Sequence, residues 1–225
     1  MKHYSHKVLR TQLEKTALKI LNKLTSRYEY PYLKGVYSRG QTLLGLIESH
    51  LKPADNFLDI MCGYSPLASP LLKSGYKITG FDENRNAIKD LKNLYPKGTW
   101  VRASYDSFLT QLDEESQFSV FLLLGAFQLC SESAFISSVT KLLDKNQPRL
   151  FFLETNKSIE KAPTIEKPLV DESAIERSIH LKGYNAILKL LFDRGYKTLD
   201  VGEYDANLDQ EWATIRIYAL LEKKT

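Results

Sequence analysis

From Asn56 onward, short apolar runs alternate with stretches in which apolar residues recur at helical spacing. The short runs predict strands at Phe57–Ile60, Lys77–Phe81, Thr99–Val101, Ser119–Leu124 and Leu150–Leu153. The stretches between them predict helices near Pro66–Ser74, Ala87–Leu94, Ser107–Leu112 and Ser131–Leu143. Such alternation is typical of the doubly wound α/β class, in which helices cover both faces of a parallel sheet.

The last part of the chain completes this pattern. A helix is predicted at Tyr184–Arg194, followed by strands at Lys197–Glu203 and Trp212–Leu221. The loop between these two strands is short and polar, so the strands should run antiparallel, because a parallel return needs a longer crossover. We therefore predict a mainly parallel seven-stranded sheet with an antiparallel last strand, plus N-terminal helices.

The pattern divides the chain into two parts. Residues 1–53 form a predicted N-terminal helical extension, with helices at 8–24 and 41–51 separated by a tyrosine-rich stretch that holds a proline and a glycine. Residues 54–225 form the predicted α/β domain. Within it, residues 154–182 are polar and interrupt the strand–helix order, which indicates either an insertion over the site or an ordinary surface excursion.

Composition narrows the class of protein. The 225 residues include 43% hydrophobic residues, enough for a substantial core, and no uninterrupted apolar run is long enough for a membrane span. The first residues lack the apolar stretch of a secretory signal. Two cysteines, Cys62 and Cys130, are too few for a disulfide framework, and four scattered histidines without a paired-cysteine motif predict no metal site. We expect a soluble cytoplasmic protein.

Charge is distributed unevenly. The net charge is +4, but residues 1–53 carry ten Lys and Arg against three Glu, which leaves +7 there and −3 over the remainder. A basic arm of this kind can dock on phosphates or an acidic ligand, or it can be a solvated helix face. Tyrosines are interleaved with Arg27, Lys34 and Arg39, and they suit either stacking on bases or packing as a lid over a site, which we favour.

The strongest local signal is the segment NFLDIMCGYSPLASPLL, which begins at Asn56. An apolar strand runs into Asp59, a small-residue turn follows through Cys62 and Gly63, and Pro66 opens a helix. In doubly wound sheets this first strand-to-helix turn lets the backbone approach a ligand at the carboxyl edge of the sheet.

A second signal supports the first. The next predicted strand ends on Asp82, twenty-three positions after Asp59. An acidic residue at this place suits a ribose diol, because a carboxylate accepts hydrogen bonds from both hydroxyls at once. Glu83 is a neighbouring carboxylate that can substitute, although strand alternation should point it elsewhere.

Together these residues resemble the first motif of the class I S-adenosylmethionine-dependent methyltransferases, an acidic residue followed by alternating glycines. Gly63 stands at the central glycine, while Met61 and Ser65 replace the two flanking glycines. The resemblance implies that Asp59 orients the methionine end of the cofactor and that the turn backbone from Met61 through Cys62 to Gly63 lies beside it.

The resemblance covers residues 56–153, and residues 184–221 match the family in element order. It implies an adenine contact from Ser104 or Asp106 after the third strand, and a wall below the sulfonium that includes Gly125 after the fourth. No Asn-Pro-Pro-Tyr-type tetrapeptide follows that strand, which argues against enzymes that methylate amino groups of DNA bases or protein glutamine. The glycine order of a nicotinamide dehydrogenase is also absent.

The resemblance implies methyl transfer from S-adenosylmethionine, for which the protein mainly aligns acceptor, methyl carbon and sulfur. An oxygen or ring-nitrogen acceptor also needs a general base, for which His180 and Glu154 are the candidates. We favour a small-molecule acceptor. The alternatives are RNA, bound by the basic arm, and a non-catalytic protein that only binds S-adenosylmethionine.

Overall fold

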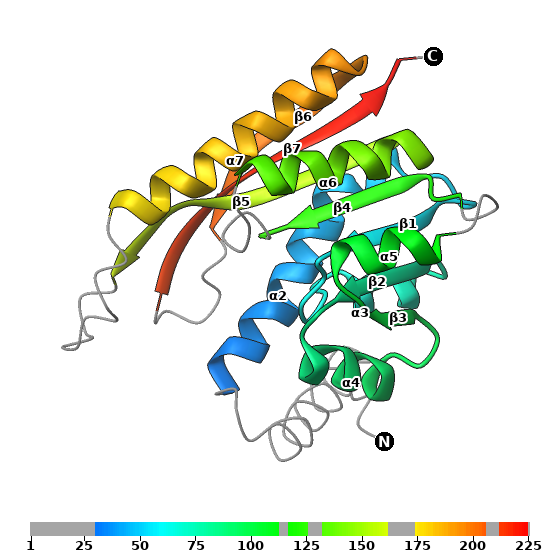
Figure 1. Ribbon diagram of the computed structural model, residues 1–225. Helices are drawn as coiled ribbons and strands as arrows, with labels where there is room; N and C mark the ends of the chain where they lie inside the picture. The colour runs from blue at the N-terminus through cyan, green and yellow to red at the C-terminus, as the bar shows by residue number, and fades with distance from the viewer. Residues whose placement is uncertain (1–29, 113–116, 126–131, 162–173, 206–211, 225) are drawn as a thin grey trace, which may run out of the picture.

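The computed structural model describes residues 30–112, 117–125, 132–161, 174–205 and 212–224. Seven strands form one sheet in the order β3-β2-β1-β4-β5-β7-β6 (Figure 1). The strands are β1 (Asn56–Ile60), β2 (Lys77–Asp82), β3 (Thr99–Arg102), β4 (Val120–Leu124), β5 (Leu150–Lys161), β6 (Tyr196–Asp205) and β7 (Trp212–Lys223). Neighbouring strands are parallel except where β7 pairs with β5 and β6. The predicted fold class is therefore confirmed.

Helices cover both faces of the sheet (Figure 1). The described helices are α2 (Tyr30–Ile47), the short 3-10 helix η1 (Glu48–His50), α3 (Ala68–Lys73), α4 (Arg85–Leu94), α5 (Tyr105–Gln111), α6 (Glu132–Lys145) and α7 (Ala174–Asp193). Side chains from α2, α3 and α4 join one buried hydrophobic cluster, and side chains from α5, α6 and α7 join the other. The helix predicted at 8–24 lies outside the described residues.

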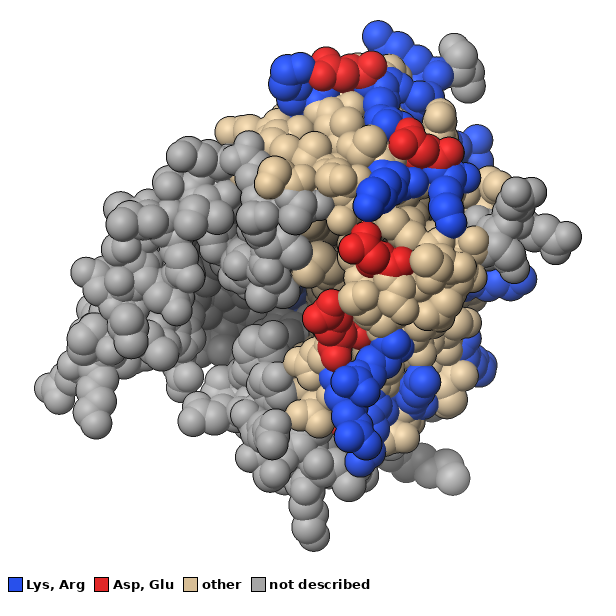
Figure 2. Space-filling model, in the orientation of Figure 1, with Lys and Arg blue, Asp and Glu red and all other residues tan. Residues whose placement is uncertain are grey.

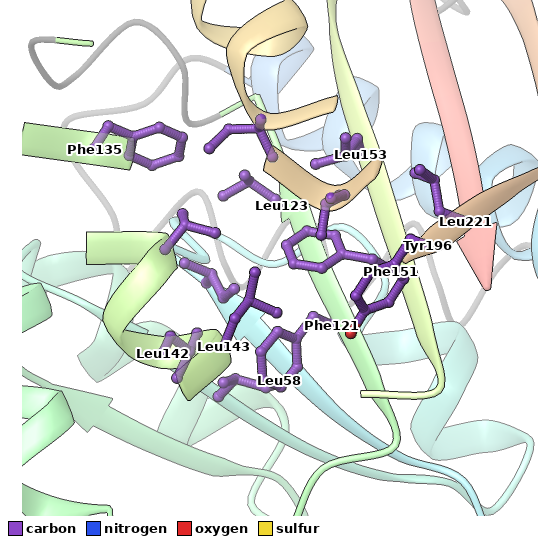
Figure 3. Close-up of a cluster of buried hydrophobic side chains, with 14 of the residues drawn as sticks. Leu58, Phe121, Leu123, Phe135, Leu142, Leu143, Phe151, Leu153, Tyr196 and Leu221 are labelled. Atoms are coloured by element: carbon purple, nitrogen blue, oxygen red, sulfur yellow. The ribbon is translucent and has the colours of Figure 1, made fainter. Parts of the chain in front are cut away.

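The core lies on both sides of the central strands β1, β4 and β5. Because successive side chains of a strand point to opposite faces, each central strand supplies residues to both clusters. Figure 3 shows the cluster beneath α6, where Phe121 and Phe151 meet edge to face with ring centroids 5.7 Å apart. These strands are buried on both faces, which explains why their sequences are continuous apolar runs rather than alternating ones.

Two boundaries in the second half of the chain differ clearly from the sequence prediction. β5 was expected to end at Leu153 but continues to Lys161, because its polar second half pairs with β7, with one register shift after Asn156. α7 begins at Ala174, ten residues before the predicted start. Part of the predicted insertion at 154–182 is thus regular strand and helix. That this segment covers the site remains a prediction.

Helix α2 also extends further than the sequence suggests, since it begins at Tyr30 and runs through Pro31 and Gly35. A proline is tolerated in the first turn, because the N–H groups there have no acceptor within the helix and the missing N–H costs no hydrogen bond. The helix approaches the turn after β1 so closely that a Cβ on Gly40 would lie 1.9 Å from the carbonyl oxygen of Pro66. None of the described helices has the length and apolar composition needed to cross a membrane.

Candidate functional site

The candidate site lies at the carboxyl edge of the sheet. The strand order reverses between β1 and β4, and ligands of doubly wound folds bind outside the carboxyl ends of the strands at such a switch point. Asp59 is near the end of β1, Asp82 ends β2, and Gly125 follows β4 directly. The structure therefore brings the predicted residues of three strands to one edge.

The turn after β1 has an unusual backbone. Met61, Gly63 and Ser65 adopt φ values of 53°, 50° and 45°, which places alternate residues in the left-handed region. Glycine adopts this conformation freely, whereas other residues lose roughly 1–2 kcal/mol each. The alternating glycines of the motif thus have a geometric reason, and this chain keeps the geometry at two positions where the glycine is replaced.

Gly63 connects the turn to the next strand. Its N–H donates to Oδ2 of Asp82 over 2.8 Å, and the N–H of Asn84 donates to Oδ1 over 2.7 Å. A Cβ on Gly63 would meet nothing within 4 Å, so the space beside it is open. Each carboxylate oxygen of Asp82 has a second lone pair, which leaves the group able to accept hydrogen bonds from a ligand.

Asp59 is 1% exposed, and strand alternation places it on the same face of β1 as Phe57, which packs in the cluster with α2. Its Oδ2 accepts a hydrogen bond of 2.5 Å from the Ser65 hydroxyl, while its buried Oδ1 has no partner among the described residues. Burial raises the pKa of this carboxyl to about 7, and the charge of Asp82 adds to the effect, while Ser65 and Arg39 oppose it. Asp59 is therefore a carboxyl that a nearby positive charge would readily ionise.

Met61 and Cys62 occupy the inner part of the turn. Met61 is half-buried and packs against the hydrophobic cluster on the α5 to α7 side. The Cys62 N–H donates to the carbonyl oxygen of Phe81 over 3.0 Å. Burial raises the pKa of the Cys62 thiol well above its usual range, so the thiol stays protonated and is a poor nucleophile.

The residues after β3 have different surroundings. The Ser104 hydroxyl caps α5 by accepting from the Ser107 N–H over 3.2 Å. Asp106, the other predicted adenine contact, has a 77% exposed side chain that pairs with Lys141 over 3.7 Å. Glu83, the predicted substitute for Asp82, is also exposed. The adenine contact from Ser104 or Asp106 stays a prediction.

Tyr105 was not found by sequence reasoning. It lies between the two adenine candidates at the start of α5, with its ring edge-on to Phe81 at a centroid distance of 5.5 Å. Its buried hydroxyl has no hydrogen-bond partner within the described part of the chain. Burial raises the pKa of this phenol, so the hydroxyl remains a donor at neutral pH.

Glu154 is surrounded by basic side chains. It is fully buried, and its carboxylate accepts hydrogen bonds from Arg39, from Arg216 at 2.8 and 2.9 Å, and from the Tyr204 hydroxyl at 2.5 Å. Burial alone would raise the pKa of Glu154, but the two arginines and Tyr204 outweigh it and lower that pKa. A carboxylate held ionised in this way is a poor proton acceptor, contrary to its predicted role as a base. His180 lies in α7, but its side chain is outside the described part of the structure.

Gly125, which was predicted to lie in the wall below the sulfonium, is close to the two arginines that bond to Glu154. It has a φ of 73°, and a Cβ there would lie 3.5 Å from Arg216 Nη1 and 3.6 Å from Arg39 Nη2. Sequence reasoning placed Arg39 only within the basic arm and missed Tyr204 and Arg216. No local signal marks them, because their importance depends on contacts between strands and α2 that are distant along the chain.

Comparison with solved structures agrees with this geometry. No protein-family model matches the chain, and no curated protein matches it by sequence. A methyltransferase domain of bacterial CtHen1-C superposes with a TM-score of 0.59 at 15% identity, covering 83% of this chain and 97% of that one. Magnesium protoporphyrin IX methyltransferase from Synechocystis, solved with bound S-adenosylmethionine, gives 0.58 at 12% identity and covers 100% of both chains.

An S-adenosylmethionine-dependent methyltransferase from Methanosarcina mazei gives a TM-score of 0.56 at 15% identity, over 79% of this chain and 96% of that one. These similarities concern the fold, since the identities are low. The chain has the Rossmann-like fold of the class I S-adenosylmethionine-dependent methyltransferases, with a seven-stranded, mostly parallel sheet.

Proposed function

We propose that the protein transfers a methyl group from S-adenosylmethionine to a small-molecule acceptor. The observation that carries this proposal is the turn after β1, where left-handed residues alternate and open space lies beside Gly63. The hydrogen bond from the Gly63 N–H to Asp82 sets this turn against the carboxylate that suits a ribose. The shared fold of known methyltransferases supports the same assignment.

The residues present fit this cofactor. The unpartnered Oδ1 of Asp59 suits the ammonium of the methionine end, because a cation beside the carboxyl would ionise it. The remaining lone pairs of Asp82 suit the ribose hydroxyls. The absence of a side chain at Gly63 allows close approach of the nucleoside to the backbone.

When bound, the cofactor supplies a methyl group on a positively charged sulfur, which is already a strong electrophile. The protein then has to hold and align the reactants and keep water out. In this proposal Asp82 and the turn hold the nucleoside, and Asp59 orients the methionine end. Gly125, which has no side chain, leaves room beside β4 for the acceptor.

Two observations support a small molecule over RNA as acceptor. Helix α2, from the predicted basic arm, lies against the turn after β1 and contributes Arg39 to the sheet edge, as a part that closes a site would. On the face shown in Figure 2, described acidic and basic side chains are interspersed. A nucleic-acid surface instead collects Lys and Arg into a patch or stripe.

Binding of S-adenosylhomocysteine, measured by calorimetry, tests the proposal. Asp82→Ala should weaken binding by about 1.5–3 kcal/mol, the usual value of a hydrogen bond to a charged group. Asp200→Ala is the matched control, because Asp200 also accepts a hydrogen bond, from Tyr218 at 3.0 Å, but on the outer strands. Equal affinities in parent and Asp82→Ala would remove Asp82 from the site, and a parent that does not bind would end the proposal.

A further inference from the structure

Two arginines from distant parts of the chain meet at one buried acid. Arg39 comes from α2 and Arg216 from β7, and both bond to Glu154 on β5. Tyr204, opposite Arg216 in the β6–β7 pair, donates to the same carboxylate. We name Arg39 and Arg216 the arginine pair.

The charges and hydrogen bonds of this group do not balance. Among the described residues, Glu154 is the one carboxylate that bonds to the two guanidinium groups. The carboxyl of Asp59 also acts on Arg39, but its pKa is raised to about 7, so the arginine pair has one positive charge in excess wherever Asp59 is protonated. In the bonds of the structure, Arg39 uses only Nη2 and Arg216 only Nη1 on Glu154. The Nε of each arginine is buried and lacks a partner among the described residues. Each arginine therefore has hydrogen-bond donors that Glu154 does not use.

The arginine pair also stands where a ligand is expected. Both bonded nitrogens lie about one contact distance from the position of a Gly125 Cβ, at 3.5 and 3.6 Å, beside the switch point between β1 and β4. The side chains of Arg39 and Arg216 are 13% and 15% exposed, while that of Glu154 is 0% exposed. The acid is sealed, and the arginines keep an accessible part.

Arg149 shows what a purely structural arginine looks like in this protein. It pairs with buried Asp55 at 2.6 Å and approaches Glu222 at 3.9 Å, so one arginine faces two carboxylates. Its Nε is unpartnered as well, so that feature alone does not indicate a ligand. What distinguishes the arginine pair is the excess of positive charge, which is costly to bury without a counter-charge.

We propose that the arginine pair is a carboxylate-binding subsite of the methyl-transfer site, an inference that rests on the proposed function. Glu154 and Tyr204 hold the two guanidinium groups in place, and the planar fork of arginine matches a carboxylate with two parallel hydrogen bonds. The carboxylate belongs either to the methionine end of the cofactor or to the acceptor.

Calorimetry with two cofactor analogues separates these sources. S-adenosylhomocysteine carries the carboxylate, and its decarboxylated form keeps the amine, the thioether and the nucleoside. If the carboxylate is the cofactor's, the parent should bind the decarboxylated form at least tenfold more weakly. Arg39→Gln and Arg216→Gln should weaken the binding of S-adenosylhomocysteine at least tenfold and that of the decarboxylated form less than twofold. Arg216→Lys should recover part of the lost affinity for S-adenosylhomocysteine. Arg149→Gln should change neither.

If the carboxylate is the acceptor's, all variants should bind both analogues alike. Parent protein saturated with S-adenosylhomocysteine should then bind acetate or benzoate by saturation-transfer NMR, and Arg39→Gln and Arg216→Gln should not. The inference is overturned if Arg39→Gln and Arg216→Gln weaken the binding of both analogues equally. It is also overturned if the variants and the parent bind every carboxylate tested with the same affinity. Failure of the proposed function looks different, because the parent itself would then bind neither analogue.

Discussion

Gly63 allows the clearest test at the scale of a single residue. Gly63 and Gly75 both have positive φ, at 50° and 87°, and a Cβ on either would meet nothing within 4 Å. Substitution by alanine should therefore lower the free energy of unfolding by about 1 kcal/mol at either position, because alanine is strained at positive φ. Only Gly63→Ala should also weaken the binding of S-adenosylhomocysteine, by at least tenfold in calorimetry. The reason is that the alanine methyl group at position 63 would occupy space that the ligand needs.

Gly75→Ala serves as the control, since Gly75 follows α3 near the start of β2, away from the carboxyl edge. Normal binding by Gly63→Ala would show that the turn after β1 does not hold the cofactor.

Asp59 predicts a pH dependence of stability. Its pKa is about 7 in the folded protein, raised mainly by burial, against an ordinary value near 3.8. A raised acid pKa means that the folded state binds the proton more tightly, so this contribution to stability is full below about pH 4 and is lost as the pH rises to 7. Asp59→Asn keeps an acceptor for Ser65 and should flatten the curve of unfolding free energy over this range.

The same group predicts a pH dependence of binding. If the ionised Asp59 faces the cofactor ammonium, affinity for S-adenosylhomocysteine should rise about tenfold per pH unit between pH 5.5 and about 7 and then level off. Calorimetry in buffers of different ionisation enthalpy should show release of a proton below pH 7. Affinity that does not vary with pH in the parent would place Asp59 away from the ammonium.

At the scale of elements, α2 is the helix on which the site depends. A Cβ on Gly40 would lie 1.9 Å from the Pro66 carbonyl oxygen, whereas one on Gly45 of the same helix would meet nothing. Gly40→Ala should destabilise the protein by about 1–3 kcal/mol in chemical denaturation, because backbone must move, and should weaken cofactor binding through neighbouring Arg39. Gly45→Ala should instead stabilise it by roughly 0.5–1 kcal/mol, since alanine favours a helix.

A Gly40→Ala variant as stable as the parent would mean that α2 does not pack against this turn.

The outer strands show why element boundaries were partly missed. The second half of β5 is polar and has the composition of a loop, but its backbone pairs with β7 as far as Lys161 and Trp212. Ladder hydrogen bonds supplied by a partner strand override local composition, and these cannot be inferred from one segment. The same pairing places Arg216 on the face of the sheet that carries Glu154.

At the scale of the whole molecule, the N-terminal charge is the feature to test. Reversing Lys19, Lys23, Arg27 and Lys34 to Glu should leave binding of S-adenosylhomocysteine within about twofold, because none of them belongs to the proposed site. The parent should show no RNA binding of micromolar or tighter affinity in filter binding at physiological salt. Tighter RNA binding, with a salt slope near 0.7 per phosphate contact, would favour the RNA alternative.

The sequence by itself determined the parts of this protein that depend on neighbours along the chain. Apolar runs marked the central strands because these strands are buried on both faces. Asp59 and Asp82 could be selected because each lies where a strand ends, and Gly63 because it lies in the turn that follows β1. The same local motif placed the turn after β1, whereas its left-handed backbone conformation was found only in the structure.

Only the tertiary structure decided the surroundings of Glu154. Arg39 lies 115 positions before it and Arg216 lies 62 after it, so no spacing in the sequence relates the three. Their meeting depends on α2 packing against the turn after β1 and on β7 inserting between β5 and β6. Because the pKa of a buried carboxyl is set by the charges that the fold brings to it, the sequence could propose Glu154 as a base, and only the structure could show it held ionised between two arginines.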